Sequence, residues 1–199
     1  TASENSSATR YADNGELFWS LASVLTFMPF VRRIHIVTDE QVPEAISKLK
    51  VVFDISDVEK IVVVDHKEIF RNFLDLLPTF NSRSIETMLF KIPNLSEKFV
   101  YFNDDIFLLR SIKPEDWFVD SKPVLRGSWS TPPFERLLWD QIKKGVIKLF
   151  LPNKKIDLQA SFQVNQWTAA KLLGFKFRYF KSGHTPLAMD RNRLENYFK

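Results

Sequence analysis

Apolar residues recur at helical spacing near the start of the chain. Leu17, Leu21, Val24, Leu25 and Met28 follow the i, i+4, i+7, i+8, i+11 pattern of an amphipathic helix. Asp13, with Glu16 three residues later, resembles a capping box at the start of this helix, and Pro29 marks its end. The small polar residues at positions 1–9 predict a disordered lead-in.

Short runs rich in β-branched or aromatic residues predict strands in the rest of the chain. The predicted strands are Arg33–Thr38, Lys60–Asp65, Lys98–Phe102 and Phe175–Phe180. The predicted helices are Gln41–Leu49, Ser82–Ile92, Phe134–Lys144 (interrupted by Gly145), Ser161–Leu173 (ended by Gly174) and Asp190–Lys199. Because strands and helices alternate, the pattern favours one α/β domain over residues 10–199, with a mostly parallel central sheet and a helical insertion. Val62, Val64, Phe99 and Tyr101 are expected to be buried in adjacent central strands.

Composition narrows the class of protein. The 199 residues include 19 Phe and only 5 Gly, enough for a substantial core. The chain has no Cys, which excludes disulfides and cysteine metal sites. A net charge of +4 is too small to indicate nucleic-acid binding, and it suits an anionic substrate or a membrane surface equally well. The longest apolar stretch, Leu17–Val31, is too short and too polar to span a bilayer.

Common nucleotide and hydrolase motifs are absent. The chain contains no GxGxxG, GxxxxGK[ST], HExxH or GxSxG pattern. It begins with Thr and shows no basic-then-apolar signal peptide, so we expect a piece of a longer protein or a processed product.

The strongest local signal is the acidic segment that follows the predicted strand Lys98–Phe102. Asn103, Asp104 and Asp105 place a carboxamide and two carboxylates at the end of that strand, where ligands bind in open α/β sheets. Oxygen ligands suit Mg²⁺ or Mn²⁺, which in turn hold diphosphates. The alternative is that these residues only form a turn between two strands, the second being Ile106–Leu109.

The remaining candidates are histidines, and polar residues at predicted helix starts. His184 lies in a loop with Gly183 and Pro186 and is either a general base or a solvated loop residue. His66 follows a predicted strand and could lie at the rim of the sheet, whereas His35 lies within a strand and is interpreted as structural. Arg10 could hold a phosphate, while Asp13 could simply cap a helix. The loop that enters the helix at Ser82 contains four polar residues: Asn81, Ser82, Arg83 and Glu86. Their side chains could bind a sugar or a phosphate, or they could merely cap the helix.

Taken together, these segments resemble the Stealth family, sugar-phosphate transferases of bacterial capsule synthesis that also include the animal N-acetylglucosamine-1-phosphotransferase. The similar segments, in order, are Arg10–Leu17, Val31–Thr38 with Gln41–Pro43, Val64–Phe70, Leu77–Ser82 with Ile85 and Glu86, Phe99–Asp105 and Gly183–Pro186. They match the family's second conserved region and the His-x-Pro of its third. The first region, an Asp-rich strand with a Thr-Trp-Val core, and the fourth region are absent from this sequence.

The resemblance implies a fold like that of nucleotide-sugar transferases and the transfer of a sugar-1-phosphate from a UDP-sugar to an acceptor hydroxyl, with release of UMP. It implies that Asp104 and Asp105 hold Mg²⁺ or Mn²⁺ and that His184 takes the acceptor's proton. The residues implied to bind the donor or its phosphates are Arg10, Asp13, Asn14, Asn103, Asn81, Ser82 and His66. The acceptor would be an oligo- or polysaccharide.

Two other functions stay open at this stage. One is a conventional metal-dependent glycosyltransferase, which would release UDP, and the other is a non-catalytic carbohydrate-binding fragment. The expected location is the bacterial cytoplasm, at the inner face of the plasma membrane, where such polymers are assembled, with peripheral association with that membrane.

Overall fold

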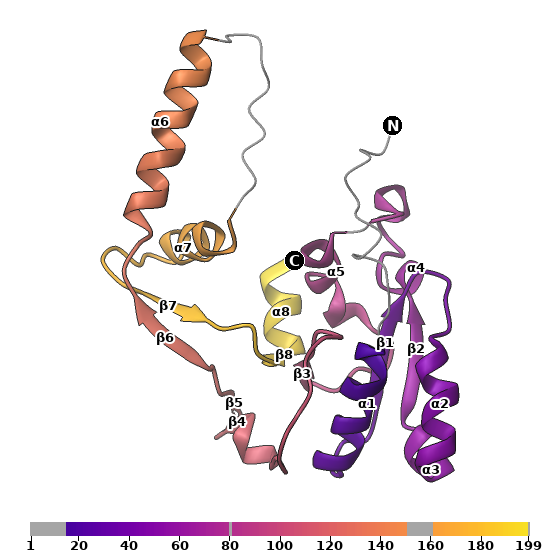
Figure 1. The fold of residues 1–199 in the computed structure, drawn as a ribbon. Helices are drawn as coiled ribbons and strands as arrows, with labels where there is room; N and C mark the ends of the chain where they lie inside the picture. Colours follow the sequence, from indigo (N-terminus) through magenta and orange to yellow (C-terminus); the bar gives the residue numbers. More distant parts are fainter. Residues whose placement is uncertain (1–14, 80, 151–160, 199) are drawn as a thin grey trace. The chain divides into compact units, whose positions relative to one another are not determined.

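The computed structural model describes residues 15–79, 81–150 and 161–198 of the chain. The described residues divide into two compact units: those within 15–124 and 186–198, and those within 125–150 and 161–185. Figure 1 shows the elements of both units, coloured along the sequence. Among the described residues, no helix combines the length and the apolar character needed to cross a bilayer. The assignment of residues 10–199 to a single domain stays a prediction, and the lead-in at residues 1–9 lies outside the described ranges.

The first unit contains both predicted N-terminal strands and most of the predicted helices. Its helices are α1 (Glu16–Phe27), α2 (Glu44–Val52), α3 (Ile55–Val58), α4 (His66–Ile69), α5 (Ser82–Glu86) and α8 (Arg191–Phe198), with short 3₁₀ turns at Leu74–Leu76, Leu89–Lys91 and Pro114–Asp116. Its strands are β1 (Ile34–Thr38), β2 (Ile61–Asp65), β3 (Lys98–Tyr101), β4 (Phe118–Val119), β5 (Lys122–Pro123) and β8 (Leu187–Asp190).

Strands β1 and β2 form the parallel pair that their β-branched sequences predict. Ile34 lies opposite Ile61, and the register continues to Thr38 opposite Asp65. Helices α2 and α3 make the crossover between the two strands, as Figure 1 shows beside β2. The carboxyl ends of both strands therefore meet at one edge, which places the residues after Thr38 next to the residues after Asp65.

The prediction of one mostly parallel central sheet is wrong for the next strand. β3 does not pair with β2; it pairs antiparallel with β8, with Lys98 opposite Asp190 and Tyr101 opposite Leu187. The predicted strands Lys60–Asp65 and Lys98–Phe102 thus lie in separate two-stranded sheets, and β4 and β5 form a third, antiparallel pair. The mixed α/β class holds, but a strand near the C-terminus, which the sequence did not predict, is the partner of β3.

Three clusters of apolar side chains hold this unit together. Val64, Phe70, Leu89 and Ile92 are buried in one cluster, and Phe99, Tyr101 and Val62 pack against it while partly exposed. Of the residues expected to be buried together, Val62, Val64, Phe99 and Tyr101, only Val64 is therefore fully buried. Their packing is between two separate sheets rather than within one. The second cluster joins α1, β1 and α2 through Leu21, Ile36 and Leu49, and the third joins α1 to β8 through Val24, Met28, Trp117 and Ala188.

Several predicted boundaries shift in the structure. The helix predicted at Ser82–Ile92 ends at Glu86 and resumes only as the 3₁₀ turn Leu89–Lys91. The segment Ile106–Leu109 is not a strand. The predicted start of α1 at Asp13 lies outside the described residues, and Gly15, at φ 86°, stands at the N-cap without a side-chain hydrogen bond.

The second unit pairs a two-stranded sheet with two helices. β6 (Gly127–Ser130) runs antiparallel to β7 (Tyr179–Ser182), and the helices are α6 (Phe134–Phe150) and α7 (Phe162–Leu172). A Cβ at Gly127 would lie 2.2 Å from the carbonyl oxygen of Lys181, so this close strand approach requires glycine.

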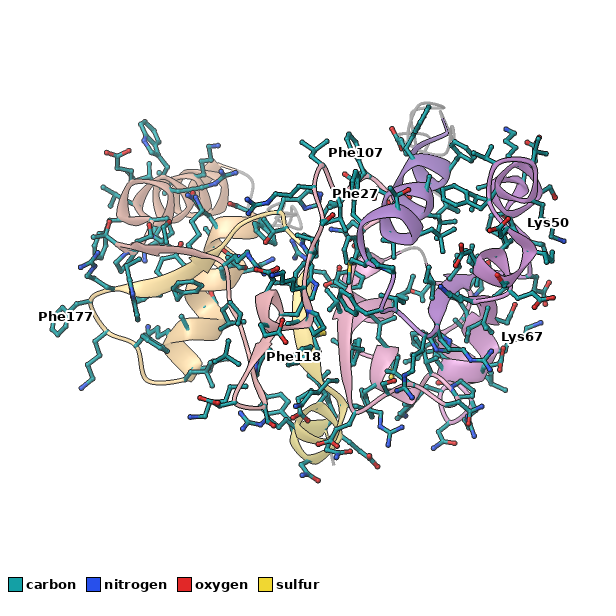
Figure 2. The ribbon with its side chains drawn as sticks, turned by 90° about the horizontal axis from the view of Figure 1, so that it is seen from below. Phe27, Lys50, Lys67, Phe107, Phe118 and Phe177 are labelled. Carbon is teal, nitrogen blue, oxygen red and sulfur yellow. The ribbon has the colours of Figure 1, made fainter. Side chains whose placement is uncertain are left out.

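Of three predictions made from the sequence for the second unit, two differ from the structure and one is confirmed. Gly145 does not interrupt α6, because one glycine costs a helix only about 1 kcal/mol. The strand predicted at Phe175–Phe180 is shifted toward the C-terminus, and Phe177 is an exposed loop residue (Figure 2). Gly174, at φ 90°, ends α7 as its sequence predicts.

Candidate functional site

The acidic segment after β3 is a tight turn with exposed carboxylates. Phe102 packs its ring edge-on against buried Trp117, with the ring centroids 6.0 Å apart. The backbone then reverses, and the N–H of Ile106 donates to the carbonyl oxygen of Asn103 at 3.3 Å. Asp104 and Asp105 occupy the two central positions of this turn and are exposed. The turn expected as the alternative to a ligand site is therefore present, and its geometry leaves both carboxylates accessible.

Helix α1 holds the chain that follows this turn. The N–H of Leu108 donates to Oγ of Ser23 at 2.9 Å, and the Ser23 hydroxyl donates to the carbonyl oxygen of Ser20 at 2.7 Å. Further on, the N–H of Ile112 donates to the carbonyl oxygen of Phe27 at 3.0 Å. Phe27 and Phe107, labelled in Figure 2, belong to these two segments. The acidic turn is thus anchored by β3 on one side and by α1 on the other.

The hydroxyl of Tyr101 links the turn to helix α5. It lies 3.1 Å from Oε1 of Glu86, and it also contacts the side-chain oxygen of Asn103. A tyrosine hydroxyl has one proton, so it cannot donate to both acceptors. The contacts are satisfied when the Asn103 amide is turned so that its NH₂ group donates to the tyrosine oxygen while the hydroxyl donates to Glu86. This chain of hydrogen bonds fixes the conformation of Asn103 at the first position of the turn.

Negative charge accumulates around this hydroxyl. Burial, followed by the nearby carboxylate of Glu86 and then by Asp104 and Asp105, raises the pKa of Tyr101 well above its usual value. Tyr101 therefore stays a neutral hydrogen-bond donor throughout the physiological range. Three carboxylates close to one neutral hydroxyl create a negative potential that attracts a cation.

The chemistry of the turn fits a cation that is shared with a substrate. Among the residues that the structure describes, no group of three or more His, Cys, Asp or Glu is arranged to hold a metal ion. Mg²⁺ is commonly bound by only one or two carboxylates, with its other positions taken by water and substrate phosphates. Asp104 and Asp105 supply that number of carboxylates on an exposed turn, so they suit a metal that binds together with a diphosphate.

The predicted donor-binding pair Asn81 and Ser82 lies at the start of α5. Oδ1 of Asn81 accepts a hydrogen bond from the N–H of Arg83 at 3.1 Å, which makes Asn81 the N-cap of the helix. Both residues are exposed, and Glu86 at the other end of the same short helix contacts Tyr101. Helix α5 therefore connects the Asn81–Ser82 loop with the acidic turn.

His66 is buried at the carboxyl edge of the β1–β2 pair. It is 7% exposed and begins α4, and its Nδ1 lies 4.0 Å from Oδ1 of Asp39, which follows β1. The preceding Asp65 caps α4: its carboxylate accepts from the N–H groups of Lys67 and Glu40, both at 2.8 Å. The hydrogen bond from Lys67 is the main cause that holds the pKa of Asp65 below its usual value. His66 thus lies at the rim, as the sequence predicts, with its side chain turned inward.

His184 belongs to the second unit. It is exposed and follows the end of β7 and Gly183. The side-chain nitrogen of Gln166, on α7, donates to the carbonyl oxygen of Ser182 at 3.1 Å and to its Oγ at 2.7 Å. Helix α7 thereby fixes the strand end from which the His184 loop departs.

The structure brings some predicted site residues together and adds others. Asn103, Asp104 and Asp105 lie together, and Asn81 and Ser82 lie on the helix that contacts their turn. His66 lies at the carboxyl edge of the β1–β2 pair, where its ring packs against Phe70 with the centroids 6.5 Å apart. Arg10, Asp13 and Asn14 lie outside the described residues.

Sequence reasoning missed the link through Tyr101 and the position of Asp39. The available signals were an amphipathic tyrosine one residue before the end of a strand segment and an acidic residue directly after β1.

Comparisons with known proteins agree on one family. The model of Stealth protein CR2, conserved region 2, matches residues 10–125. A capsular polysaccharide phosphotransferase of Actinobacillus suis is 47% identical over 109 residues, which are 55% of this chain and 27% of that protein. One from Haemophilus influenzae is 46% identical, also over 109 residues, which are 27% of its length.

A human protein is similar over nearly the same extent. The alpha/beta subunits of N-acetylglucosamine-1-phosphotransferase are 40% identical over 119 residues, which are 60% of this chain and 9% of that protein. The chain therefore spans less than a third of the length of these curated relatives. The family match at residues 10–125 contains the acidic turn, Tyr101 and Glu86.

Proposed function

The chain belongs to the Stealth protein family, and we propose that it forms part of the catalytic region of a sugar-1-phosphate transferase. The donor is a UDP-sugar carrying a hexose or N-acetylhexosamine, and the acceptor is a hydroxyl of an oligo- or polysaccharide. The product is a phosphodiester in a capsular or other surface polysaccharide, and UMP is released. The family's named phosphotransferases support this reaction class.

The observation that carries the proposal is the exposed pair Asp104 and Asp105 on a turn held from two sides. A phosphoryl-transfer site needs positioned groups and charge neutralisation more than covalent chemistry. Tyr101 and Glu86 hold Asn103 at the start of the turn, and α1 holds the chain after it. The carboxylates are therefore presented by a fixed backbone while their oxygens remain accessible.

In the proposed reaction the acceptor oxygen attacks the phosphorus that carries the sugar. A new phosphorus–oxygen bond forms, the bond to the bridging oxygen of the diphosphate breaks, and UMP leaves with that oxygen. His184 takes the proton of the acceptor hydroxyl. Asp104 and Asp105 would hold Mg²⁺ or Mn²⁺, which when bound neutralises charge on the diphosphate. Asn103, Asn81 and Ser82 bind oxygens of the donor.

Arg10, Asp13, Asn14 and His66 complete the proposed donor site, Arg10 by balancing phosphate charge. We place the reaction in the bacterial cytoplasm at the inner face of the plasma membrane. The net charge of +4 would favour contact with an anionic lipid surface.

The test is an incubation of the chain with Mg²⁺, an oligosaccharide acceptor and a panel of UDP-sugars, with released nucleotides separated by ion-exchange chromatography. UMP release supports the proposal, and UDP release indicates a conventional glycosyltransferase. If neither nucleotide appears, binding of UDP-sugar and of acceptor is measured by calorimetry; acceptor binding alone indicates a carbohydrate-binding fragment.

The matched variants are Asp105→Asn and Asp120→Asn. Asp105→Asn should lower the rate of UMP release by about 10²-fold or more, because a lost charge contact removes several kcal/mol of transition-state stabilisation. Asp120 is an exposed turn residue at φ 48°, a conformation that asparagine adopts well, so its variant should keep full activity. Full activity of Asp105→Asn, or of the wild type in EDTA, contradicts the metal assignment.

A further inference from the structure

Strand β1 has one hydrogen-bonding edge without a strand partner among the described residues. Within the described ranges it pairs only with β2. The N–H of Ile34 donates to the carbonyl oxygen of Lys60, so Ile34 and every second residue after it turn their backbone groups toward β2. The N–H and C=O groups of His35 and Val37 consequently point to the opposite edge.

Strand β3 has an unpaired edge of the same kind. It pairs only with β8 within the described parts of the chain. The N–H of Arg191 donates to the carbonyl oxygen of Glu97, which identifies Glu97 and Arg191 as a hydrogen-bonded pair. In an antiparallel ladder such pairs alternate, so Phe99 and Tyr101 bond to β8. The backbone groups of Lys98 and Val100 therefore point away from β8.

Both strands line one groove of about 680 Å³. Ile34 and His35 of β1 face it, as do all four residues of β3. The Cα atoms of β1 and β3 lie mostly more than 8 Å apart, whereas neighbouring strands in a sheet are separated by about 4.8 Å. The two strands are therefore not neighbours in one sheet, and the groove between them is the space that a further strand would occupy.

The groove has the volume of a short strand. From a rise of about 3.3 Å per residue, a strand spacing of about 4.8 Å and a layer thickness of about 10 Å, each residue of a packed strand occupies about 160 Å³. A volume of 680 Å³ then holds about four residues, close to the five of β1 and the four of β3.

The walls of the groove show what kind of strand fits. Val24 of α1 and Met28, which directly follows α1, line it, and so do Leu89, Ile92 and Leu95 of the core. The same groove is also lined by charged residues: Arg32, Arg33, Glu97, Lys98 and Glu115. A strand in this groove must therefore be apolar where it meets the core residues, and it can carry polar side chains toward the charged residues. Nδ1 of His35, a further lining residue, is buried and has no hydrogen-bond partner among the described residues. An inserted strand would also bring a polar backbone or side-chain group close to this nitrogen.

We propose that the groove receives one extended strand from a part of the Stealth polypeptide outside conserved region 2, which joins the two sheets in the order β2-β1-inserted strand-β3-β8. Because the buried core residues Leu89 and Ile92 are among those that line the groove, we treat the strand that fills it as a permanent component of the fold rather than a transient ligand. In the Actinobacillus suis relative the 109 matched residues are 27% of the protein, so about 300 residues lie outside the match and can supply the strand.

The first experiment screens for that strand. Overlapping 15-residue peptides cover the part of the Actinobacillus suis protein that lies outside the matched residues, each with a fluorescent label. Binding to the complete 199-residue chain is measured by fluorescence polarisation, and binding peptides are retested for their effect on thermal unfolding. We expect at least one peptide with an apolar run to bind saturably and to raise Tm. Binding by no peptide overturns the proposal.

Proline substitution then tests the edge itself. Val100→Pro removes an N–H that points into the groove and takes none from the β3–β8 ladder, so it should weaken peptide binding at least 10-fold. Val42→Pro is the matched control, because Val42 is 78% exposed, lies outside the groove and precedes Pro43; binding should be unchanged. Equal binding by a folded Val100→Pro variant contradicts strand insertion at this edge.

Amide hydrogen exchange of the wild-type chain gives a second test that needs no variant. The bound peptide should slow exchange at least 10-fold at His35, Val37, Lys98 and Val100, and should leave the already bonded amide of Phe99 little changed. Protection only at other amides overturns the proposal. Protection of these four amides without peptide, at a level that depends on chain concentration, also overturns it, because it indicates that a second copy of the chain is the occupant.

Discussion

Replacing Tyr101 with Phe removes the hydroxyl that connects the acidic turn to helix α5 and leaves the ring that packs against the core. Glu86 loses a hydrogen bond of 3.1 Å, and Asn103 loses its contact with the same oxygen. We expect the variant to fold, to be less stable than the wild type and to hold Asn103 less firmly.

The magnitude follows from the two partners. A hydrogen bond to a charged group contributes about 1.5–3 kcal/mol, and the lower end applies here because Tyr101 is only partly buried. The neutral contact with Asn103 adds about 0.5–1 kcal/mol. The expected loss is therefore about 2 kcal/mol in the free energy of unfolding. With an m-value of about 2 kcal/mol per M, the midpoint of urea unfolding should fall by about 1 M.

Urea unfolding followed by circular dichroism measures this loss, with two tyrosines as controls. Tyr197→Phe, at a residue that is 74% exposed, should change stability by less than about 0.5 kcal/mol. Tyr179→Phe should be neutral or stabilising, because its buried hydroxyl has no hydrogen-bond partner among the described residues. A double-mutant cycle with Glu86→Gln isolates the charge-dependent part of the pair, because the glutamine carbonyl oxygen can still accept, and it should give a coupling energy of about 1 kcal/mol.

The pH dependence of the same measurement tests the electrostatic reasoning. Burial and Glu86 raise the pKa of Tyr101 in the folded protein, whereas in the unfolded chain it is about 10. The stabilising contribution is therefore fully present below pH 10 and declines as the pH rises further, by about 1.4 kcal/mol at pH 11. A difference between wild type and Tyr101→Phe that stays constant from pH 8 to 11, or a coupling energy below about 0.3 kcal/mol, refutes the proposed link.

Three further substitutions test the core, a helix cap and the proposed base. Val64→Asp should abolish soluble expression, because an unpaired charge at a site 3% exposed costs several kcal/mol of a total of about 5–15. Asp65→Ala should lower the free energy of unfolding by about 1 kcal/mol at pH 7, whereas Asp54→Ala, at an N-cap without a side-chain bond, should not. The N–H of Lys67 holds the pKa of Asp65 low, so the difference should disappear as the pH falls below about 4; a difference that persists there contradicts this cause. His184→Ala should lower UMP release about 10²–10⁴-fold and flatten the acidic limb of the rate profile while donor binding is retained; an unchanged profile identifies a loop residue.

Local patterns in the sequence were sufficient for much of the first unit. The helical spacing from Leu17 to Met28 corresponds to α1, and the β-branched runs correspond to β1 and β2. Gly174 ends α7 because only a residue that tolerates positive φ fits there easily. The Asn-Asp-Asp turn after β3 was identified by the same means, since turn chemistry depends on neighbouring residues. Family membership likewise follows from the order of short segments along the chain.

Tertiary structure decided what depends on residues far apart in the sequence. β3 pairs with β8 about 90 positions later, and no local pattern marks Leu187–Asp190 as its partner. The link from Tyr101 to Glu86 and the inward orientation of His66 arise because packed helices and strands bring these side chains together. The unpaired edges of β1 and β3 become visible only when both line one groove. Periodicity determines which face of an element is apolar, but the element that covers that face is selected by long-range packing and backbone hydrogen bonding.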